Sequence, residues 1–281
     1  MELWFTEHHT KDTTFSIRVT NRLANVASQF QTIEVYESRD FGRILVIDGY
    51  LMLTEKDEFI YHEMITHVPM AVNPYAQDVL VIGAGDGGTV RELTRYNSIK
   101  RIDMVEIDEK VVEVCRKYLP QTAGMLDDER VNLFFTDGVE FVTDKAVEYD
   151  LIIVDSTDPF GPGEGLFTRK FYADCHRALK SGGILVNQME SPYYPDDALA
   201  AKSSYQKLKD VFPLVKAYQA HIPTYPSGHW LFGFASKEPD PIKNLKADQW
   251  NALGLETNYY NTELHKGSFA LPNYVLNILN S

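Results

Sequence analysis

From about residue 61 onward, short apolar segments alternate with amphipathic ones, and this alternation allows few folds. The apolar segments are DVLVIGAG, RIDMVEID, VNLFFTD, YDLIIVDS and GGILVNQ, and stretches such as EKVVEVCRKYL and TRKFYADCHRALK separate them. Apolar strands that alternate with helices are typical of a mostly parallel sheet covered on both faces. PLVKAYQAHIP and HWLFGFAS predict a final antiparallel hairpin. We therefore predict an α/β, Rossmann-like doubly wound domain over residues 61–281.

The first part of the chain, residues 1–60, has a different pattern. TTFSIRVT, QTIEVYES and GRILVIDGYLMLTEKDE alternate apolar and polar residues, as half-buried strands do. Asp48-Gly49 lies between RILVI and YLMLT and indicates a tight hairpin, because glycine accepts a positive φ. We therefore predict a small N-terminal all-β domain ahead of the α/β domain.

Composition and charge exclude several classes of protein. The chain has 281 residues, of which 44% are apolar, and a formal net charge of −13. That charge argues against a general nucleic-acid binder and is compatible with a cationic small molecule. Cys115 and Cys175 belong to no CxxC pair, so we expect neither a disulfide framework nor a zinc knuckle. With no signal-peptide pattern and no apolar run near the ~20 residues that cross a bilayer, we expect a cytoplasmic protein that binds no membrane.

A glycine-rich loop follows the first strand of the α/β domain. In VLVIGAGDGGTV, the residues Gly83, Gly85 and Gly88 satisfy the pattern GxGxxG ahead of a helix that we expect to begin near Thr89. Such a loop lets a nucleotide or nucleoside lie against the backbone. Glycines in this place also serve a tight turn and close helix packing, so the pattern alone leaves both interpretations open.

The ends of the next two strands add polar groups. Glu106 ends one strand, at the rough spacing where an acidic residue accepts hydrogen bonds from both ribose hydroxyls. Asp137-Gly138 ends the following strand and suits a turn against the edge of a base, although Asp-Gly is also an ordinary turn. Together with the glycine loop, these residues fit either a dinucleotide or S-adenosylmethionine.

Asp86 lies in the middle of the glycine loop, where a phosphate would be expected. Two unit charges about 4 Å apart at an effective dielectric of about 20 interact by about 4 kcal/mol. A carboxylate here therefore disfavours a pyrophosphate or the carboxylate of S-adenosylmethionine, and it favours a cationic tail. The alternative is that Asp86 points to solvent or caps the helix near Thr89, a frequent role of aspartate.

Acidic residues follow each of the successive strands. They are Asp86, Glu106, Asp137, Asp155 and Asp158. Because ligands bind beyond the carboxyl ends of parallel strands, we expect these side chains to meet at one crevice. So much negative charge needs a metal or an organic cation beside it. No His/Cys arrangement indicates a transition metal, and magnesium would leave the adenosine-type loops unexplained, so we expect no metal.

Aromatic residues fit an organic polycation better than a metal. Tyr61 and His62 in YHEM, and Tyr225 in PTYPSGHW, can line a groove beside methylene groups and bind amines. Cation–π contacts of this kind stabilise by about 0.5–2 kcal/mol. Each of these residues alone is also consistent with a place in the core, since the chain has 16 tyrosines.

Several motifs in order resemble those of the spermidine synthase family. They are WFTE near the start, YHEM at the domain join, GAGDGGTVREL, EIDEKVVEVCRKYLP, DSTDPFGPGEGLF, IPTYPSGHW and SFALPNYV near the end. Members of this family are polyamine aminopropyltransferases with a class I methyltransferase-like fold, an N-terminal β-domain and a dimeric or tetrameric assembly. The resemblance implies transfer of an aminopropyl group from decarboxylated S-adenosylmethionine to putrescine, which yields spermidine and methylthioadenosine. The nucleoside is then a co-substrate, and no cofactor is expected.

The resemblance also implies roles for single residues. Asp155 would be the proton acceptor, and Asp86 would hold the amine of the aminopropyl group. The residues implied to bind the nucleoside substrate, together with the loop glycines, are Gln31, Gly83, Gly85, Glu106, Asp137, Gly138 and Pro162. Those implied to line the amine groove are Tyr61, His62, Asp158, Gln188 and Tyr225, with Trp4 near its far end.

Three other functions remain compatible with parts of this pattern. An ordinary S-adenosylmethionine-dependent methyltransferase would share the nucleoside loops but needs room for the carboxylate that Asp86 disfavours. An NAD-dependent dehydrogenase fits GxGxxG but not the acidic strand ends. A polyamine-binding protein without activity could keep the fold, and it would tolerate the loss of Asp155.

Overall fold

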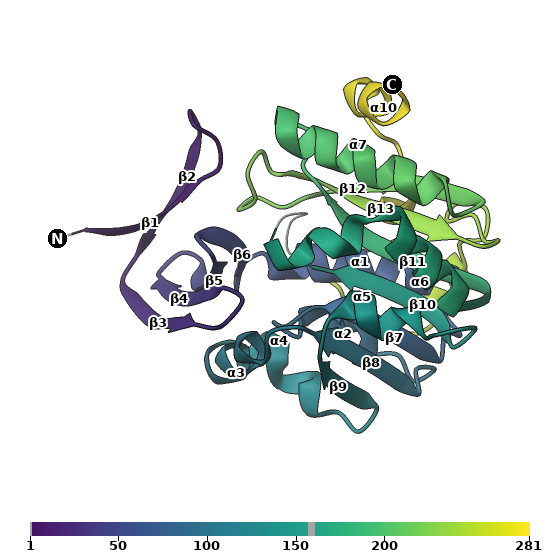
Figure 1. Cartoon of the computed structure of the whole chain (residues 1–281), viewed down its shortest axis with the longest axis horizontal. Coiled ribbons are helices and arrows are strands. Elements are labelled where there is room, and N and C mark those ends of the chain that lie inside the picture. Colours follow the sequence, from purple (N-terminus) through teal and green to yellow (C-terminus); the bar gives the residue numbers. More distant parts are fainter. Residues whose placement is uncertain (1, 157–160) are drawn as a thin grey trace.

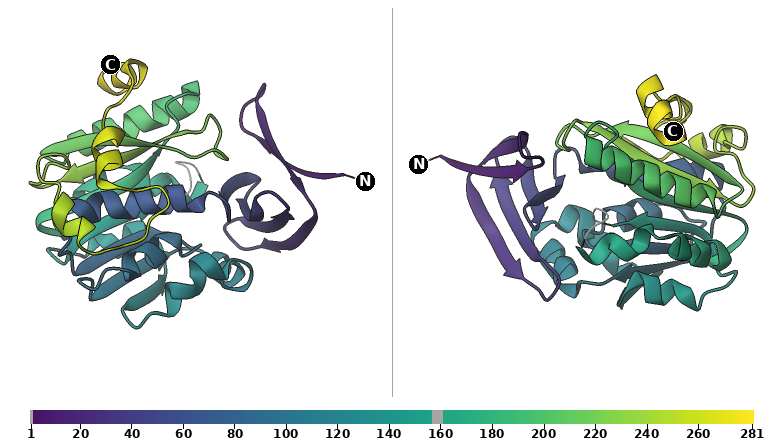
Figure 2. Two further views of the ribbon diagram at one scale, coloured as in Figure 1. Left: turned by 180° about the vertical axis from the view of Figure 1, so that it is seen from behind. Right: turned by 45° about the horizontal axis from the view of Figure 1, so that its top comes forward.

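Two small antiparallel sheets form the N-terminal part of the protein. The computed structural model describes residues 2–156 and 161–281. A two-stranded sheet pairs β1 with β2, and a four-stranded sheet has the order β3-β4-β5-β6. The bounds are β1 Leu3–His8, β2 Thr14–Val19, β3 Asn21–Ala27, β4 Thr32–Ser38, β5 Gly42–Ile47 and β6 Tyr50–Thr54. Both sheets lie at one end of the molecule in all three views (Figures 1 and 2).

The hairpin expected at Asp48-Gly49 is confirmed. These two residues alone connect β5 to β6, and their φ angles are 50° and 87°. Both angles lie in the left-handed region, which matches the twist of the two flanking strands.

The α/β part is built on a seven-stranded sheet in the order β12-β13-β11-β10-β7-β8-β9. The pairs from β11 to β9 are parallel, while β13 is antiparallel to both β11 and β12. The strands are β7 Asp78–Gly83, β8 Arg101–Glu106, β9 Val131–Phe135, β10 Tyr149–Asp155, β11 Leu179–Glu190, β12 Leu214–His221 and β13 His229–Ser236. This topology confirms the Rossmann-like α/β fold and its final antiparallel hairpin.

Helices cover the sheet and connect its strands. They are α1 Glu58–Val72, α2 Gly88–Thr94, α3 Glu109–Tyr118, α4 Pro120–Ala123, α5 Gly138–Thr143, α6 Arg169–Ala178, α7 Pro195–Lys209, α8 Ala247–Asn251, α9 Thr262–Ser268 and α10 Asn273–Asn280, with 3-10 turns at Gly124–Asp127 and Gly161–Phe167. The predicted domain boundary after residue 60 falls inside α1. Within the described residues, none of these helices has the length and apolarity to span a bilayer.

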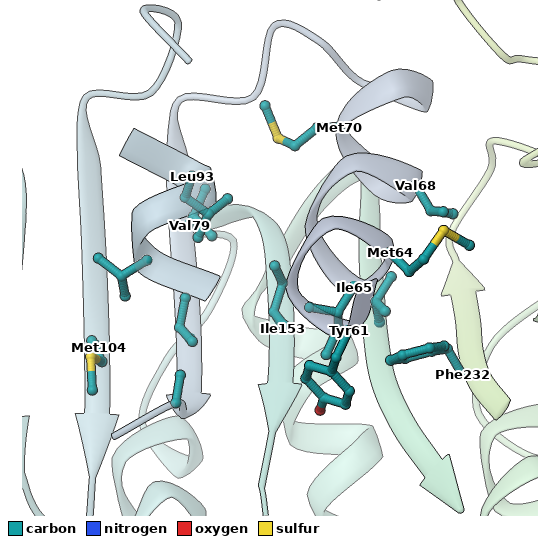
Figure 3. Packing of buried hydrophobic residues seen from close by; sticks show 14 of the residues in the cluster. Tyr61, Met64, Ile65, Val68, Met70, Val79, Leu93, Met104, Ile153 and Phe232 are labelled. Atoms are coloured by element: carbon teal, nitrogen blue, oxygen red, sulfur yellow. The ribbon is translucent and has the colours of Figure 1, made fainter. Parts of the chain in front are cut away.

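Alternate residues of β7 belong to two different apolar clusters. Val79 and Val81 pack in the cluster that contains α1, whereas Leu80 and Ile82 pack in the cluster that contains α6. This two-residue period explains why the strand reads as a continuous apolar run. Figure 3 shows the α1 side of this core, with Tyr61 at its lower edge and its hydroxyl pointing in the direction of the arrows of the parallel strands.

The carboxyl ends of the parallel strands meet at one edge of the sheet. Asp155 pairs with Gly83 at the ends of β10 and β7, and Glu106 pairs with Phe135 at the ends of β8 and β9. The acidic residues that follow these strands are therefore brought to the same edge, which faces the N-terminal sheets.

Candidate active site

A cavity of about 310 Å³ lies at this edge and extends toward the N-terminal sheets. Its volume is at the lower end of the range for small-molecule sites. Among the residues that line it are most of those predicted from the sequence: Gln31, Tyr61, His62, Gly83, Gly85, Asp86, Glu106, Asp137, Gly138, Asp155, Gln188 and Tyr225. The expected convergence of the strand-end carboxylates is confirmed for Asp86, Glu106, Asp137 and Asp155.

Asp155 lines this cavity at the end of β10 and is only 9% exposed. Its two carboxylate oxygens accept hydrogen bonds from the Tyr61 hydroxyl at 2.7 Å and the Thr89 hydroxyl at 2.6 Å. Burial and the neighbouring Asp86 carboxylate raise the pKa of Asp155, against the opposing effect of His62 and these two donors. A buried carboxylate with a raised pKa and fixed orientation is suited to accept a proton.

Asp86 is paired with a buried histidine. One of its oxygens lies 3.2 Å from His62 Nε2 and also accepts a hydrogen bond from the Gly88 amide at 2.8 Å. On the other side of the ring, His62 Nδ1 lies 2.5 Å from Glu58. Burial by itself would lower the pKa of His62, but the two carboxylates raise it to about 10. His62 is therefore an imidazolium that partly neutralises Asp86. Asp86 is not the N-cap of α2, which is Gly87 and makes no side-chain cap hydrogen bond; Asp86 instead accepts from the amide of Gly88, the first residue of the helix.

Arg91 adds a further ion pair to the series that links Asp86, His62 and Glu58. Its guanidinium donates to both oxygens of Glu58, at 2.7 and 3.0 Å, and to Glu92 at 3.0 Å. The sequence reasoning missed Glu58 and Arg91. The four-residue spacing of Glu58 and His62 in EFIYH was an available signal for their contact on one helix face, but nothing in the spacing indicates Arg91.

His62, Asp86 and Asp155 offer three ligand atoms within 4.8 Å of one another, a distance that could accommodate a metal ion. The donor chemistry does not fit such an ion. Both ring nitrogens of His62 face carboxylates, and an imidazolium has no lone pair for a metal. The described residues of this cluster are therefore better suited to bind an organic cation than a metal.

Three of the residues predicted to bind a nucleoside make hydrogen bonds within the protein. Glu106 accepts a hydrogen bond from the Asp108 amide at 2.9 Å, and burial raises its pKa to about 7. Gln31 reaches across from the N-terminal sheets and donates to Asp108 at 3.0 Å. Asp137 caps α5 by accepting from the Val139 amide at 2.7 Å. These side chains thus have structural partners in addition to any ligand.

Close packing explains the glycines of the loop. A Cβ atom at Gly83, where φ is 87°, would lie 2.0 Å from the Asp155 carbonyl oxygen, and one at Gly88 would lie 2.2 Å from the His62 ring. At Gly85 a Cβ would lie 2.7 Å from Val111 and 2.9 Å from Glu106. The loop needs these glycines to approach β10, α1 and α3, whether or not a nucleoside is bound.

Trp4 is not brought to the cavity. In β1 the side chains of Phe5 and Glu7 are buried, so Trp4 points the other way and is 51% exposed. Residues at the far end that the sequence did not indicate instead line the cavity: Glu7, His9, Glu190, Asp196 and Asp197. The prediction for Asp158 falls outside the described residues, as does the side chain of Pro162.

The fold and the cavity together define a protein of Rossmann-like architecture with an acid-lined cavity at the carboxyl ends of its parallel strands. The chain matches the family described as "Spermine/spermidine synthase domain" over residues 58–246 and the "Spermidine synthase tetramerisation domain" over residues 3–55. It therefore belongs to the spermine/spermidine synthase family, whose members are aminopropyltransferases.

Similar proteins cover nearly the whole chain. The polyamine aminopropyltransferases of Alkaliphilus oremlandii and of Clostridium botulinum strain Eklund 17B are each 64% identical, over 99% and 100% of this chain and 98% and 99% of their own length. A spermidine synthase solved in complex with the transition state analogue AdoDATO has a TM-score of 0.96 at 41% identity, covering 99% of this chain and 95% of its own. Spermidine synthase from Thermotoga maritima has a TM-score of 0.95 at 40% identity, covering 99% and 94%. The class of enzyme predicted from the sequence is confirmed.

Proposed function

We propose that the enzyme transfers the aminopropyl group of decarboxylated S-adenosylmethionine to putrescine. The amine nitrogen attacks the methylene carbon beside the sulfonium, so that a carbon–nitrogen bond forms and the carbon–sulfur bond breaks. The products are spermidine and methylthioadenosine, and the proton of the attacking ammonium passes to Asp155. The observation that carries this proposal is the buried Asp155 carboxylate, held by Tyr61 and Thr89 in the wall of an acid-lined cavity.

We propose that different residues of the cavity bind the two substrates. We place the nucleoside against the loop glycines and the strand ends, and the aminopropyl amine beside Asp86. The residues proposed for the nucleoside are Gln31, Gly83, Gly85, Glu106, Asp137, Gly138 and Pro162. Those proposed for the amine acceptor are Tyr61, His62, Asp155, Asp158, Gln188 and Tyr225. Gln188 already donates to the Ser156 carbonyl at 3.3 Å, and Tyr225 to the Met52 carbonyl at 2.7 Å, which holds both side chains in place.

Deprotonation of the acceptor is the energetic problem in this reaction. An alkylammonium with a pKa near ~10 needs about 4 kcal/mol to lose its proton at pH 7. Carboxylates around it raise that requirement, and nearby cations lower it. The sulfonium is one such cation. The His62 imidazolium, whose pKa is raised to about 10, is a second one within the protein itself.

Replacing Asp155 with Asn tests the proposal. The amide keeps the shape and can still bond to Tyr61 and Thr89, but it takes up no proton, so turnover should fall by about 10²–10⁴-fold. Affinity for methylthioadenosine should stay within a few-fold, as measured by titration calorimetry beside single-turnover rates. Near-normal turnover in this variant would remove Asp155 from the role. If wild-type protein instead methylated an acceptor from S-adenosylmethionine, the methyltransferase alternative would hold.

We also propose an assembly, a cofactor requirement and a cellular location for the enzyme. The N-terminal sheets match a tetramerisation domain over residues 3–55, so we propose that residues 1–60 form a domain that joins copies of the chain into an oligomer. Residues 61–281 would form the catalytic domain. We propose that the reaction needs no cofactor beyond the nucleoside co-substrate and that it occurs in the cytoplasm, where the free thiols of Cys115 and Cys175 stay reduced.

A further inference from the structure

A second cavity of about 230 Å³ adjoins the far end of the active-site cavity. It lies between the N-terminal hairpin and the loop that connects β12 to β13. The residues that line it are His9, Thr13, Thr14, Phe15, Tyr194, Pro223, Tyr225, Pro226, Ser227 and Gly228. Three of these residues, His9, Tyr225 and Pro226, line the active-site cavity as well. They therefore form the partition between the two cavities.

The three partition residues are held in different ways. Tyr225 is fixed from both ends, because its hydroxyl donates to Met52 at 2.7 Å and its ring packs 4.8 Å from Trp230. Pro226 contributes a short side chain from the loop between β12 and β13. His9 contributes a whole imidazole, which projects from the end of β1. Removal of the His9 ring would open the partition while leaving the contacts of Tyr225 with Met52 and Trp230 in place.

The imidazole of His9 connects the N-terminal sheets to the α/β part of the protein. Its Nε2 lies 3.0 Å from Asp197 at the start of α7, and its Nδ1 lies 3.5 Å from Glu7 in β1. The ring also packs 4.4 Å from the ring of Tyr194. The His9 ring thus occupies a position between two carboxylates that would otherwise suit an ammonium group.

The chemistry at this end of the cavity matches a polyamine. Glu7 and Asp197, which contact His9, line the active-site cavity, as do Glu190 and Asp196. Beyond His9, the second cavity offers hydroxyls and aromatic rings, namely those of Thr13, Thr14, Phe15 and Tyr194. Methylene segments pack well on such rings, and ammonium groups bind to their faces. A linear amine that is one segment longer than a diamine would need to pass through the place of His9.

We propose that His9 sets the length of the amine acceptor, by closing the active-site cavity against a second cavity that would take the extra segment of a triamine. This inference rests on the proposed aminopropyl transfer. It adds a residue that acts on acceptor choice and takes no part in proton transfer or nucleoside binding.

The test compares a diamine and a triamine as acceptors for one set of variants. With His9→Ala the cavities join, and Glu7 and Asp197 face the space that the ring leaves. The ratio of kcat/KM for spermidine over putrescine should therefore rise at least tenfold, with the tetraamine product identified by mass. His9→Gln keeps the bulk and can still bond to Asp197, so it should retain the wild-type ratio. His8→Ala, at an exposed neighbouring position, is the matched control and should also leave the ratio unchanged.

Each outcome bears on the proposal. An unchanged ratio in His9→Ala, with putrescine turnover retained, overturns it, as does an equal rise in His8→Ala. If His9→Ala does not yield folded protein, judged by methylthioadenosine binding, His9→Asn shortens the side chain and should raise the ratio in the same direction. No rise in that variant also overturns the proposal. Failure of the proposed function is distinguishable, because wild-type protein would then transfer no aminopropyl group to any amine.

Discussion

Replacing His62 with Gln should remove a buried charge on which the active-site region depends. The His62 ring is 3% exposed and lies between Glu58 at 2.5 Å and Asp86 at 3.2 Å. Burial opposes its charged form, yet the two carboxylates raise its pKa from 6.5 to about 10. At 1.36 kcal/mol per pH unit, this rise corresponds to about 5 kcal/mol of stabilisation of the folded state. Glutamine preserves a hydrogen-bond donor but no charge.

The direction of the pKa shift determines how this stabilisation changes with pH. Because the pKa of His62 is higher in the folded than in the unfolded protein, the stabilisation is fully present below pH 6.5. It is lost as the pH rises through about 10. At pH 7 about 4 kcal/mol should remain, and at pH 9 about 1 kcal/mol.

Urea unfolding between pH 6 and pH 10 measures this effect. The free energy of unfolding of His62→Gln should lie about 4 kcal/mol below wild type at pH 7, and the difference should shrink steadily toward pH 10. His8→Gln, at an exposed position at the end of β1, is the matched control and should stay within about 0.5 kcal/mol of wild type. A difference below about 1 kcal/mol at pH 7, or one that is constant from pH 6 to pH 9, would refute the assignment of a charged His62.

Three further changes test other parts of the site. Asp86→Asn should weaken binding of decarboxylated S-adenosylmethionine more than binding of methylthioadenosine, because only the former has a cationic tail; equal weakening in calorimetry would contradict selection by charge. The pKa of Glu106 is about 7, so if its ionised form binds the ribose hydroxyls, affinity for methylthioadenosine should rise from pH 6 to pH 8. Glu106→Gln should abolish this pH dependence, and an equally steep profile in the variant would assign it to another group. Gly88→Ala should lower the free energy of unfolding by about 1–3 kcal/mol, because the new Cβ would lie 2.2 Å from the His62 ring; an unchanged urea midpoint would show that the ring moves freely.

Much of the fold could be predicted because its signals are local. The apolar segments of β7, β8 and β10 are continuous since both faces of the sheet are covered, and each segment is marked by its own residues. The Asp48-Gly49 hairpin follows from two backbone angles that glycine and aspartate tolerate. Once the strands are parallel, their carboxyl ends must share an edge, and this is why Asp86, Glu106 and Asp155 could be placed together without coordinates.

Other parts of the site depend on contacts between segments far apart in the chain. The sequence alone left Asp86 open between a helix cap and a partner for a cation, and the packing of α1 against the loop after β7 shows a carboxylate paired with His62 one residue before the N-cap, Gly87. Trp4 could not be excluded from the groove, because the outward direction of its side chain depends on which face of β1 packs inward. His9 reaches Asp197 across 188 positions of sequence.

What the sequence by itself determined, therefore, is the alternation of strands and helices after residue 61, the acidic edge and the family, because these depend on residue type and near spacing. What only the tertiary structure decided is which charges are paired, through Glu58, His62 and Arg91, and which residues, such as His9, line both cavities. Electrostatic pairing and cavity boundaries depend on distances of a few ångströms between elements. Those distances are set by how helices and sheets pack, which no short stretch of sequence encodes.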